Sequence, residues 1–203
     1  MKPVIGVLLA GGQSRRMGGG DKNLSEIAGR PILAHVIERA RAQVDRLIIN
    51  ANGDPARFAP FDLPVVGDVV GGFQGPLAGV LTGMEWAAAN APQADWVATF
   101  ATDAPFFPDD LVARLFAAID AEGADMACAV SDGRTHPVFA LWPIRLAADL
   151  RHSLTVEEIR KIDRWTARYA LAEAEFPAAP FDPFFNINRP GDLEEARRFA
   201  AGL

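Results

Sequence analysis

The chain has 203 residues, of which 50% are hydrophobic and 23% are charged, a balance that is typical of a folded domain rather than a disordered chain. Its 26 acidic and 20 basic residues give a net charge of −6, which argues against general binding of DNA or RNA. The one cysteine, Cys128, excludes an internal disulfide and a cysteine-rich zinc site, and no apolar run approaches the roughly 18 residues of a membrane span. We therefore expect a protein of the reducing cytoplasm that contacts neither nucleic acid nor a membrane.

Strands and helices alternate along the first half of the chain. The continuous apolar run at 4–9 is typical of a strand that is buried on both faces of a parallel sheet. Further strands are expected at 46–51, 63–66 and 96–101, a helical turn at 55–59, and helices that begin at Pro31, Leu77 and Asp109. Short strands separated by helices predict an α/β fold with a mostly parallel, twisted sheet flanked by helices.

The second half of the chain has a less regular pattern. We expect strands at 126–131 and 138–142 around a turn at Asp132-Gly133, followed by a helix at 156–164. An edge strand at 169–176, a short extended piece at 185–188 and a final helix at 191–200 are expected after it. No internal repeat or clear linker divides the chain, so we expect residues 1–203 to form a single domain.

The strongest functional signal is the segment Leu9–Lys22, which follows the first strand directly. Its five glycines let the backbone approach a ligand closely, and successive N–H groups in such a loop form a nest for anions. Arg15, Arg16 and Lys22 add positive charge, so we expect the loop to bind a polyphosphate. The segment matches neither the P-loop nor the dinucleotide-binding pattern, and the alternative interpretation is a flexible surface loop with solvated arginines.

Polar side chains stand at the ends of three further predicted strands. Asn50, Asp68 and Asp103 each lie at or just beyond a strand's carboxyl end. Parallel strands end at one edge of the sheet, where α/β proteins bind their ligands, so we expect these residues to lie near the glycine-rich loop. Asp103 is well placed there to hold Mg²⁺, which prefers oxygen ligands. The alternative for each is ordinary turn or capping chemistry.

Two other segments carry groups that suit a nucleotide. Asn186 and Asn188 are two residues apart and point to the same side of an extended chain, so one amide could bind a metal or a phosphate-bound water. Asparagines just before a helix also often cap it. Backbone N–H groups in the segment 75–79 could meet a base or a sugar, or simply begin a helix at Pro76.

Candidate contacts to a second substrate lie in the second half of the chain. His136 precedes a proline near the predicted turn, although a lone histidine more often has a structural role. Arg160 and Lys161 belong to a charge run that either faces an anionic substrate or is a solvated helix face.

These motifs together resemble the molybdenum cofactor guanylyltransferases, the MobA family. That family carries Leu-Ala-Gly-Gly-x-x-x-Arg-Met-Gly-Gly-x-Asp-Lys near its N-terminus, and this chain has the pattern at Leu9–Lys22 with the same spacing. Further matches lie at 75–79, 103–106, 136–137 and 186–190. The chain departs from the family in two places. Where the family has Pro-Cys-Asp-Thr-Pro, residues 101–105 read Ala-Thr-Asp-Ala-Pro, which keeps the aspartate and the second proline. Residues 159–163 lack the family's Gly-x-Arg-x-Val.

The resemblance implies a Rossmann-like nucleotidyltransferase fold and an enzyme that transfers GMP from GTP to molybdenum-molybdopterin and releases pyrophosphate. It implies a nucleotide site at Leu9, Ala10, Gly11, Gly12, Lys22, Asn50, Asp68 and Asp103 in the N-terminal half, with Mg²⁺ as cofactor on Asp103 and Asn188. Catalysis is assigned to Arg16, Lys22 and Asp103, and the second-substrate side to the C-terminal half with His136, Arg160 and Lys161. Molybdopterin biosynthesis proteins and client molybdoenzymes are the further partners that the resemblance implies.

Two alternatives stay open. One is another nucleotidyltransferase of the same fold, which uses CTP or acts on a sugar phosphate. Gly11 stands where related cytidylyltransferases have alanine, and the space that glycine leaves favours guanine. The other is a non-catalytic carrier of a nucleotide or cofactor, against which the presence of Lys22 and Asp103 argues.

Overall fold

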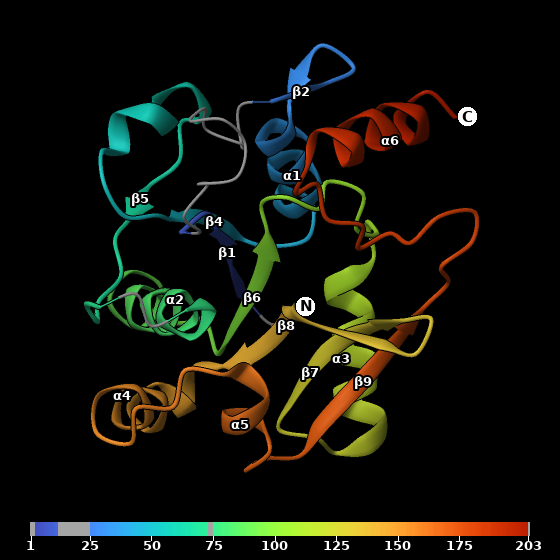
Figure 1. Cartoon of the computed structure of the whole chain (residues 1–203). Helices are drawn as coiled ribbons and strands as arrows, with labels where there is room; N and C mark the ends of the chain where they lie inside the picture. Colours follow the sequence, from blue (N-terminus) through green and yellow to red (C-terminus); the bar gives the residue numbers. More distant parts are fainter. Residues whose placement is uncertain (1–2, 12–24, 73–74, 203) are drawn as a thin grey trace.

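The computed structural model describes residues 3–11, 25–72 and 75–202. In these residues a seven-stranded sheet has the strand order β5-β4-β1-β6-β8-β7-β9, and a separate two-stranded hairpin joins β2 to β3 (Figure 1). The strands are β1 (Val4–Leu9), β2 (Glu26–Ile27), β3 (Arg30–Pro31), β4 (Arg46–Asn50), β5 (Val65–Val66), β6 (Trp96–Ala101), β7 (Met126–Ser131), β8 (Arg134–Pro143) and β9 (Leu171–Phe176). The helices are α1 (Ile32–Arg41), α2 (Pro76–Asn90), α3 (Leu111–Glu122), α4 (Ala147–Thr155), α5 (Ile162–Thr166) and α6 (Pro190–Ala200), with 3₁₀ helices η2 (Pro55–Phe61) and η3 (Ile144–Leu146).

The sheet is mostly parallel, as the alternating pattern predicts. Strand β1 pairs in parallel with β4 and β6, β4 with β5, and β7 with β9, whereas β8 runs antiparallel to both of its neighbours. The reversal at β8 follows from the tight turn after β7, in which Asp132 and Gly133 have φ values of 48° and 68°. Two successive left-handed residues are typical of a two-residue hairpin, and Asp-Gly is a favoured pair for it.

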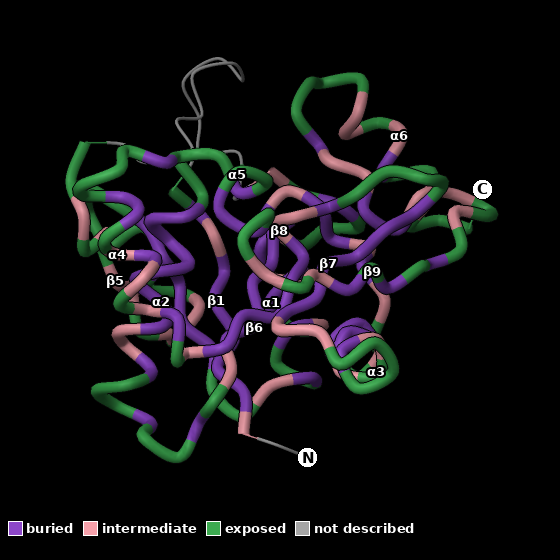
Figure 2. Tube along the Cα trace, turned by 90° about the horizontal axis from the view of Figure 1, so that it is seen from below, coloured by how far each residue is buried: buried purple, intermediate pink, exposed green. Residues whose placement is uncertain are grey.

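Helices cover both faces of the sheet because the strand residues alternate in direction. In β1, Val4 and Leu8 pack into the hydrophobic cluster under α1 and α3, while Ile5 and Val7 pack into the cluster under α2, α4 and α5. Figure 2 shows the strands buried between these helices, whose outer surfaces are exposed. Both faces are apolar, which is the condition under which a parallel sheet is stable. Among the described helices, none is long and apolar enough to cross a bilayer.

One predicted helix is wrong. The segment 156–164 was expected to be helical, but α4 ends at Thr155 and α5 begins only at Ile162. Between them Glu158 has a φ of 53°, and this left-handed residue breaks any helix. Ile159, next to the break, is buried in the same hydrophobic cluster as Trp165, so burial of apolar surface overrides the local helical spacing.

Smaller differences concern the ends of elements. The expected strand at 63–66 is reduced to Val65–Val66, and the β2–β3 hairpin lies in a region that was expected to be a loop. The edge strand expected at 169–176 is present as β9, with alternate residues buried and exposed. The expected extended piece at 185–188 belongs to no strand.

The parallel order brings the carboxyl ends of the first strands to one edge of the sheet. The last residue of β1, Leu9, is in register with Asn50 at the end of β4 and with Ala101 at the end of β6. Asn50 is in turn in register with Val66 of β5. The residues that follow these four strands therefore lie side by side.

Candidate functional site

A cavity of about 450 Å³ lies at this edge of the sheet. Its walls are formed by Leu9, Gly11, Asn50, Asp68, Gly75, Pro76, Ala101, Asp103, Val138 and Asn186. The structure thus brings together five of the residues that the sequence assigned to a nucleotide: Leu9, Gly11, Asn50, Asp68 and Asp103. A crevice outside the carboxyl ends of parallel strands is where open α/β sheets bind ligands.

Two asparagines orient the carboxylate of Asp68. The buried Asn50 donates from Nδ2 to one oxygen of Asp68 at 2.9 Å and to the carbonyl oxygen of Val66 at 3.2 Å. Asn52 donates to the other carboxylate oxygen at 2.7 Å, and its own Oδ1 accepts the Asp68 N–H at 2.9 Å. Hydrogen bonds to both oxygens hold the carboxylate in one orientation at the cavity wall.

Glycines at the start of α2 allow the helix to pack closely against Asn50. Gly75 lies just before the helix with a φ of 74°, which favours glycine, and Pro76 supplies a first helical residue that needs no N–H partner. A Cβ atom at Gly79 would lie 2.4 Å from Asn50 Oδ1 and 2.5 Å from a methyl of Leu9. Only glycine therefore lets the helix approach β1 and β4 this closely. Gly75 and Pro76 thus place the N-terminal end of α2, the positive end of its dipole, at the cavity wall.

The loop after β6 and the segment before α6 meet at the opposite wall. Thr102 donates from its hydroxyl to the carbonyl oxygen of Leu9 at 3.3 Å. The N–H of Ile187 donates to the carbonyl oxygen of Asp103 at 2.8 Å, which places Asn186 beside Asp103 at the cavity. Asn188, which the resemblance assigned to metal, is exposed and outside the lining, and its N–H donates to Asp192 Oδ2 at 2.8 Å. The structure therefore brings Asn186, rather than Asn188, to the cavity.

His136 is buried and has partners within the protein. Its Nε2 lies 2.7 Å from the hydroxyl oxygen of Ser131, and its ring stacks on Phe184 with centroids 4.5 Å apart. Burial lowers the pKa of His136, a nearby Asp182 raises it in part, and the charge of Arg134 lowers it further. A neutral, packed imidazole fits the structural reading of this histidine that the sequence left open.

The remaining predicted residues lie at the edge of the cavity or outside the described chain. Arg160 and Lys161 are exposed, and the carbonyl oxygen of Arg160 would be 3.5 Å from a Cβ at Gly75. Ala10 is buried, and its N–H donates to the carbonyl oxygen of Asn50 at 2.9 Å. The predicted Gly12, Arg16 and Lys22 lie outside the described residues.

The side chains at the cavity suit a hard divalent cation. In the described part of the chain, no group of three or more histidine, cysteine, aspartate or glutamate residues could hold a metal by itself. The cavity instead offers the carboxylates of Asp68 and Asp103 and amide oxygens, all of them oxygen donors. Mg²⁺ is usually held by one or two carboxylates together with water and substrate phosphates, so these residues fit it.

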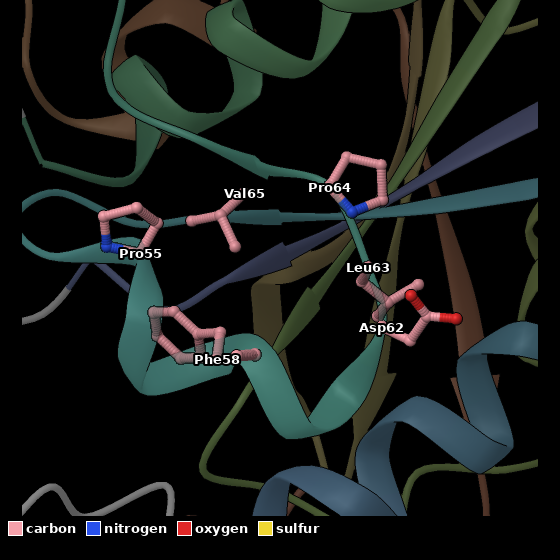
Figure 3. Close-up of a pocket in the computed structure, with 7 residues that line it drawn as sticks. Pro55, Phe58, Asp62, Leu63, Pro64 and Val65 are labelled. Carbon is pink, nitrogen blue, oxygen red and sulfur yellow. The ribbon is translucent and has the colours of Figure 1, made fainter.

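A second hollow, of about 510 Å³, lies between η2 and the residues leading into β5 (Figure 3). Phe58, Leu63 and Val65 line it with other apolar residues, and Asp62 is the one charged residue in its lining. It has no cluster of polar groups comparable to the strand-end cavity, so the strand-end cavity is the candidate active site.

Sequence reasoning missed some residues of this site. Asn52 was not singled out, although it stands two positions after Asn50, a spacing that places side chains on one side of an extended chain. Thr82 was also missed; its hydroxyl oxygen accepts the N–H of Val69 at 3.1 Å and so ties the loop after Asp68 to α2. No sequence signal pointed to Val138, which reaches the cavity from an irregular stretch of β8.

Comparison with known proteins agrees with this geometry. A family model described as a MobA-like NTP transferase domain matches residues 6–172. A protein of Rhodopseudomonas palustris (strain BisB5) named molybdenum cofactor guanylyltransferase is 59% identical over 194 residues, which are 96% of this chain and 92% of that protein. A protein of the same name from Bradyrhizobium sp. (strain ORS 278) is 58% identical over 198 residues, 98% of this chain and 93% of its own.

Among solved structures, a molybdopterin-guanine dinucleotide biosynthesis protein A from Archaeoglobus fulgidus has the same fold. Its TM-score is 0.72 at 21% identity, over 98% of this chain and all of that chain (100%). The fold agreement, the family match over most of the chain and the high identity to the curated relatives lead to one conclusion. The chain belongs to the family of MobA-like NTP transferases.

Proposed function

We propose that this chain is a molybdenum cofactor guanylyltransferase, which transfers GMP from GTP to molybdenum-molybdopterin and releases pyrophosphate. The observation that carries the proposal is the cavity in which Asn50, Asp68 and Asp103 converge beside the start of α2. The names of the relatives, which are 58–59% identical, support the guanylyl and molybdenum specificity.

The reaction exchanges one phosphorus–oxygen bond for another. A terminal phosphate oxygen of the acceptor forms a bond to the α-phosphorus of GTP, and the bond from that phosphorus to the β-phosphate bridging oxygen breaks with release of pyrophosphate. The attacking phosphate is already anionic, so alignment and charge stabilisation matter more than a strong base. In this proposal Leu9, Ala10 and Gly11 contact the nucleotide together with Gly12 and Lys22, and Arg16 and Lys22 stabilise the leaving pyrophosphate.

Asp68 and Asp103 present two carboxylates to a cavity that is to hold an anionic triphosphate. Two carboxylates and a triphosphate repel one another, so binding of GTP requires a cation between them. We propose Mg²⁺, held by Asp103 with Asp68 and the Asn186 amide oxygen close by. When bound, it would neutralise charge on the phosphate oxygens. Asn188, the other candidate ligand that the resemblance implies, is exposed and lies outside the cavity lining, so in this proposal it contacts the phosphates from outside the cavity.

The second substrate is proposed to approach from the C-terminal half of one domain that spans residues 1–203. Arg160 and Lys161 are exposed, and the backbone of Arg160 borders Gly75 at the cavity. Their positive charge suits an anionic pterin phosphate. We further propose molybdopterin biosynthesis proteins and client molybdoenzymes as partners, and the cytoplasm as the location, a reducing compartment in keeping with the single buried thiol of Cys128.

The test is a pyrophosphate-release assay on the purified chain with molybdenum-loaded molybdopterin, Mg²⁺ and either GTP or CTP. We expect release with GTP, and a loss of about 100-fold or more in kcat/KM for Asp103→Asn, the scale of a removed electrostatic contact to the reacting phosphates. Asp120→Asn, an exposed aspartate on α3, is the matched control and should retain full activity. Release with CTP and not with GTP would refute guanylyl transfer, and an Asp103→Asn variant within threefold of wild type would refute the role of Asp103.

A further inference from the structure

The segment that connects β9 to α6 contains an aspartate that the transfer reaction does not use. Residues 177–189 cross from the edge strand to the last helix without forming a strand or helix of their own (Figure 1). This segment nevertheless brings Asn186 to the cavity wall beside Asp103. Irregular segments of this length hold one conformation only where specific contacts anchor them.

Asp182 forms one of these anchors. Its Oδ1 accepts the hydroxyl hydrogen of Ser131 at 2.9 Å and the N–H of Phe184 at 2.9 Å. Ser131 is the last residue of β7 and is buried, so the carboxylate ties the connecting segment to the sheet. Because the single hydroxyl hydrogen of Ser131 goes to Asp182, His136 must donate from Nε2 to the Ser131 oxygen, 2.7 Å away. The cluster Ser131–His136–Asp182 is therefore satisfied in one arrangement.

Two further contacts complete the path from Asp182 to the cavity. The ring of Phe184 is buried and stacks on His136. The N–H of Ile187 donates to the carbonyl oxygen of Asp103 at 2.8 Å. Asn186 lies between these two fixed points. The hydrogen bonds of Asp182 are directional and fix the course that the segment takes from β9 toward Asp103.

We propose that Asp182 is a positioning residue, which acts through Ser131 and the Phe184 N–H to hold the connecting segment, and with it Asn186, against Asp103. This inference deepens the proposed function and rests on it for its effect on turnover. The positioning of the Ile187–Asp103 hydrogen bond by Asp182 can be tested whatever the substrates of the chain are.

The test compares Asp182→Ala with Asp182→Asn in the full chain. Alanine removes the Oδ1 acceptor, whereas asparagine keeps an oxygen at that position and should preserve both hydrogen bonds. Hydrogen exchange followed by NMR should show the Ile187 N–H exchanging at least tenfold faster in Asp182→Ala, with the core N–H groups of β1 and β6 unchanged. In the same variant kcat/KM for pyrophosphate release should fall at least tenfold, and both values should return to near wild type in Asp182→Asn.

A matched control is available at Asp54. Its Oδ1 accepts the N–H of Ala56 at 2.9 Å, the same local bond that Asp182 makes to Phe184, but Asp54 lies before η2 and away from the cavity lining. Asp54→Ala should change neither exchange at Ile187 nor turnover. Ser131→Ala, which removes the other end of the bond, should reproduce the faster exchange at Ile187 and provides a second variant if Asp182→Ala folds poorly.

The outcomes separate the positioning role from the proposed reaction. Unchanged exchange at Ile187 in Asp182→Ala and in Ser131→Ala, or equal acceleration across β1 and β6, overturns the positioning role whatever the turnover. Failure of the wild-type chain to release pyrophosphate refutes the proposed function, while a local tenfold change in exchange at Ile187 still supports the anchor.

Discussion

The close approach of α2 to the sheet makes Gly79 a sensitive point for the candidate site. A methyl group added at this position would lie 2.4 Å from Asn50 Oδ1, 2.5 Å from Leu9 Cδ2 and 3.2 Å from Asn50 Cγ. Contacts under 3 Å between a Cβ and these atoms force the neighbours to move. Since Asn50 orients Asp68, we expect Gly79→Ala to disturb the nucleotide site as well as the fold.

The expected change in the free energy of unfolding of Gly79→Ala follows from opposing effects. Alanine is favoured over glycine in a helix by about 1 kcal/mol, whereas overpacking of a well-packed core costs about 1–3 kcal/mol. Displacement of the buried Asn50 amide weakens its hydrogen bonds to Asp68 and Val66, at about 1 kcal/mol each. We therefore expect Gly79→Ala to lower the free energy of unfolding by about 1–3 kcal/mol, and to weaken binding of GTP with Mg²⁺ about tenfold, or about 1.4 kcal/mol.

Gly83 provides the matched control, one helical turn further along α2. A Cβ there would lie 2.4 Å from Val7 Cγ2, so Gly83→Ala overpacks the same helix against β1, but Val7 is not part of the cavity lining. Urea unfolding should show a loss of stability in both variants. Calorimetry with GTP and Mg²⁺ should show weaker binding in Gly79→Ala alone.

The comparison has a clear refuting result. Equal GTP affinity in wild type and Gly79→Ala would show that Asn50 either keeps its position or does not serve nucleotide binding. A comparable loss of affinity in Gly83→Ala would show that the effect passes through general destabilisation rather than through Asn50.

Two further predictions concern the packing behind the site. Thr99 is buried, and its hydroxyl donates to the Val138 carbonyl oxygen at 2.7 Å and accepts the Trp142 Nε1–H at 2.8 Å. Thr99→Val therefore leaves the buried indole N–H of Trp142 and the half-buried carbonyl of Val138 without these partners. Urea unfolding should show a loss of about 2–4 kcal/mol, against less than about 0.5 kcal/mol for the exposed Thr155→Val, and a loss below 1 kcal/mol would contradict this account. Asp149 accepts hydrogen bonds from Tyr169 and Trp165, which hold its pKa below the ordinary value of 3.8, the Tyr169 bond being the larger cause. The stability that these bonds contribute is complete above pH 3.8 and declines as the pH falls through the lower pKa of the folded state. The free energy of unfolding of Asp149→Asn should therefore depend less steeply on pH in this range than that of wild type. Identical acid-unfolding profiles of the two proteins would refute this account.

Local patterns in the sequence account for much of the fold. The apolar run of β1 and the alternation of short strands with amphipathic helices predict a mostly parallel sheet covered on both faces, and the Asp132-Gly133 pair predicts the hairpin that reverses β8. The pattern does not predict the break between α4 and α5, because Ile159 is buried in a cluster made by residues of the sheet and of other helices rather than by its own neighbours. Spacing along the chain carries no information about such a distant partner.

Some features of the candidate site are likewise predicted by the sequence and others are not. The positions of Asn50, Asp68 and Asp103 at or just beyond strand ends predict that they meet, because parallel strands end at one edge of the sheet. Long-range contacts bring Asn186 rather than Asn188 to the cavity, and they pack His136 inside the protein with Ser131. Strand direction and helical period are local properties of the chain. The course of an irregular connecting segment is set by long-range hydrogen bonds, here those of Asp182 and Ile187, which no local pattern encodes.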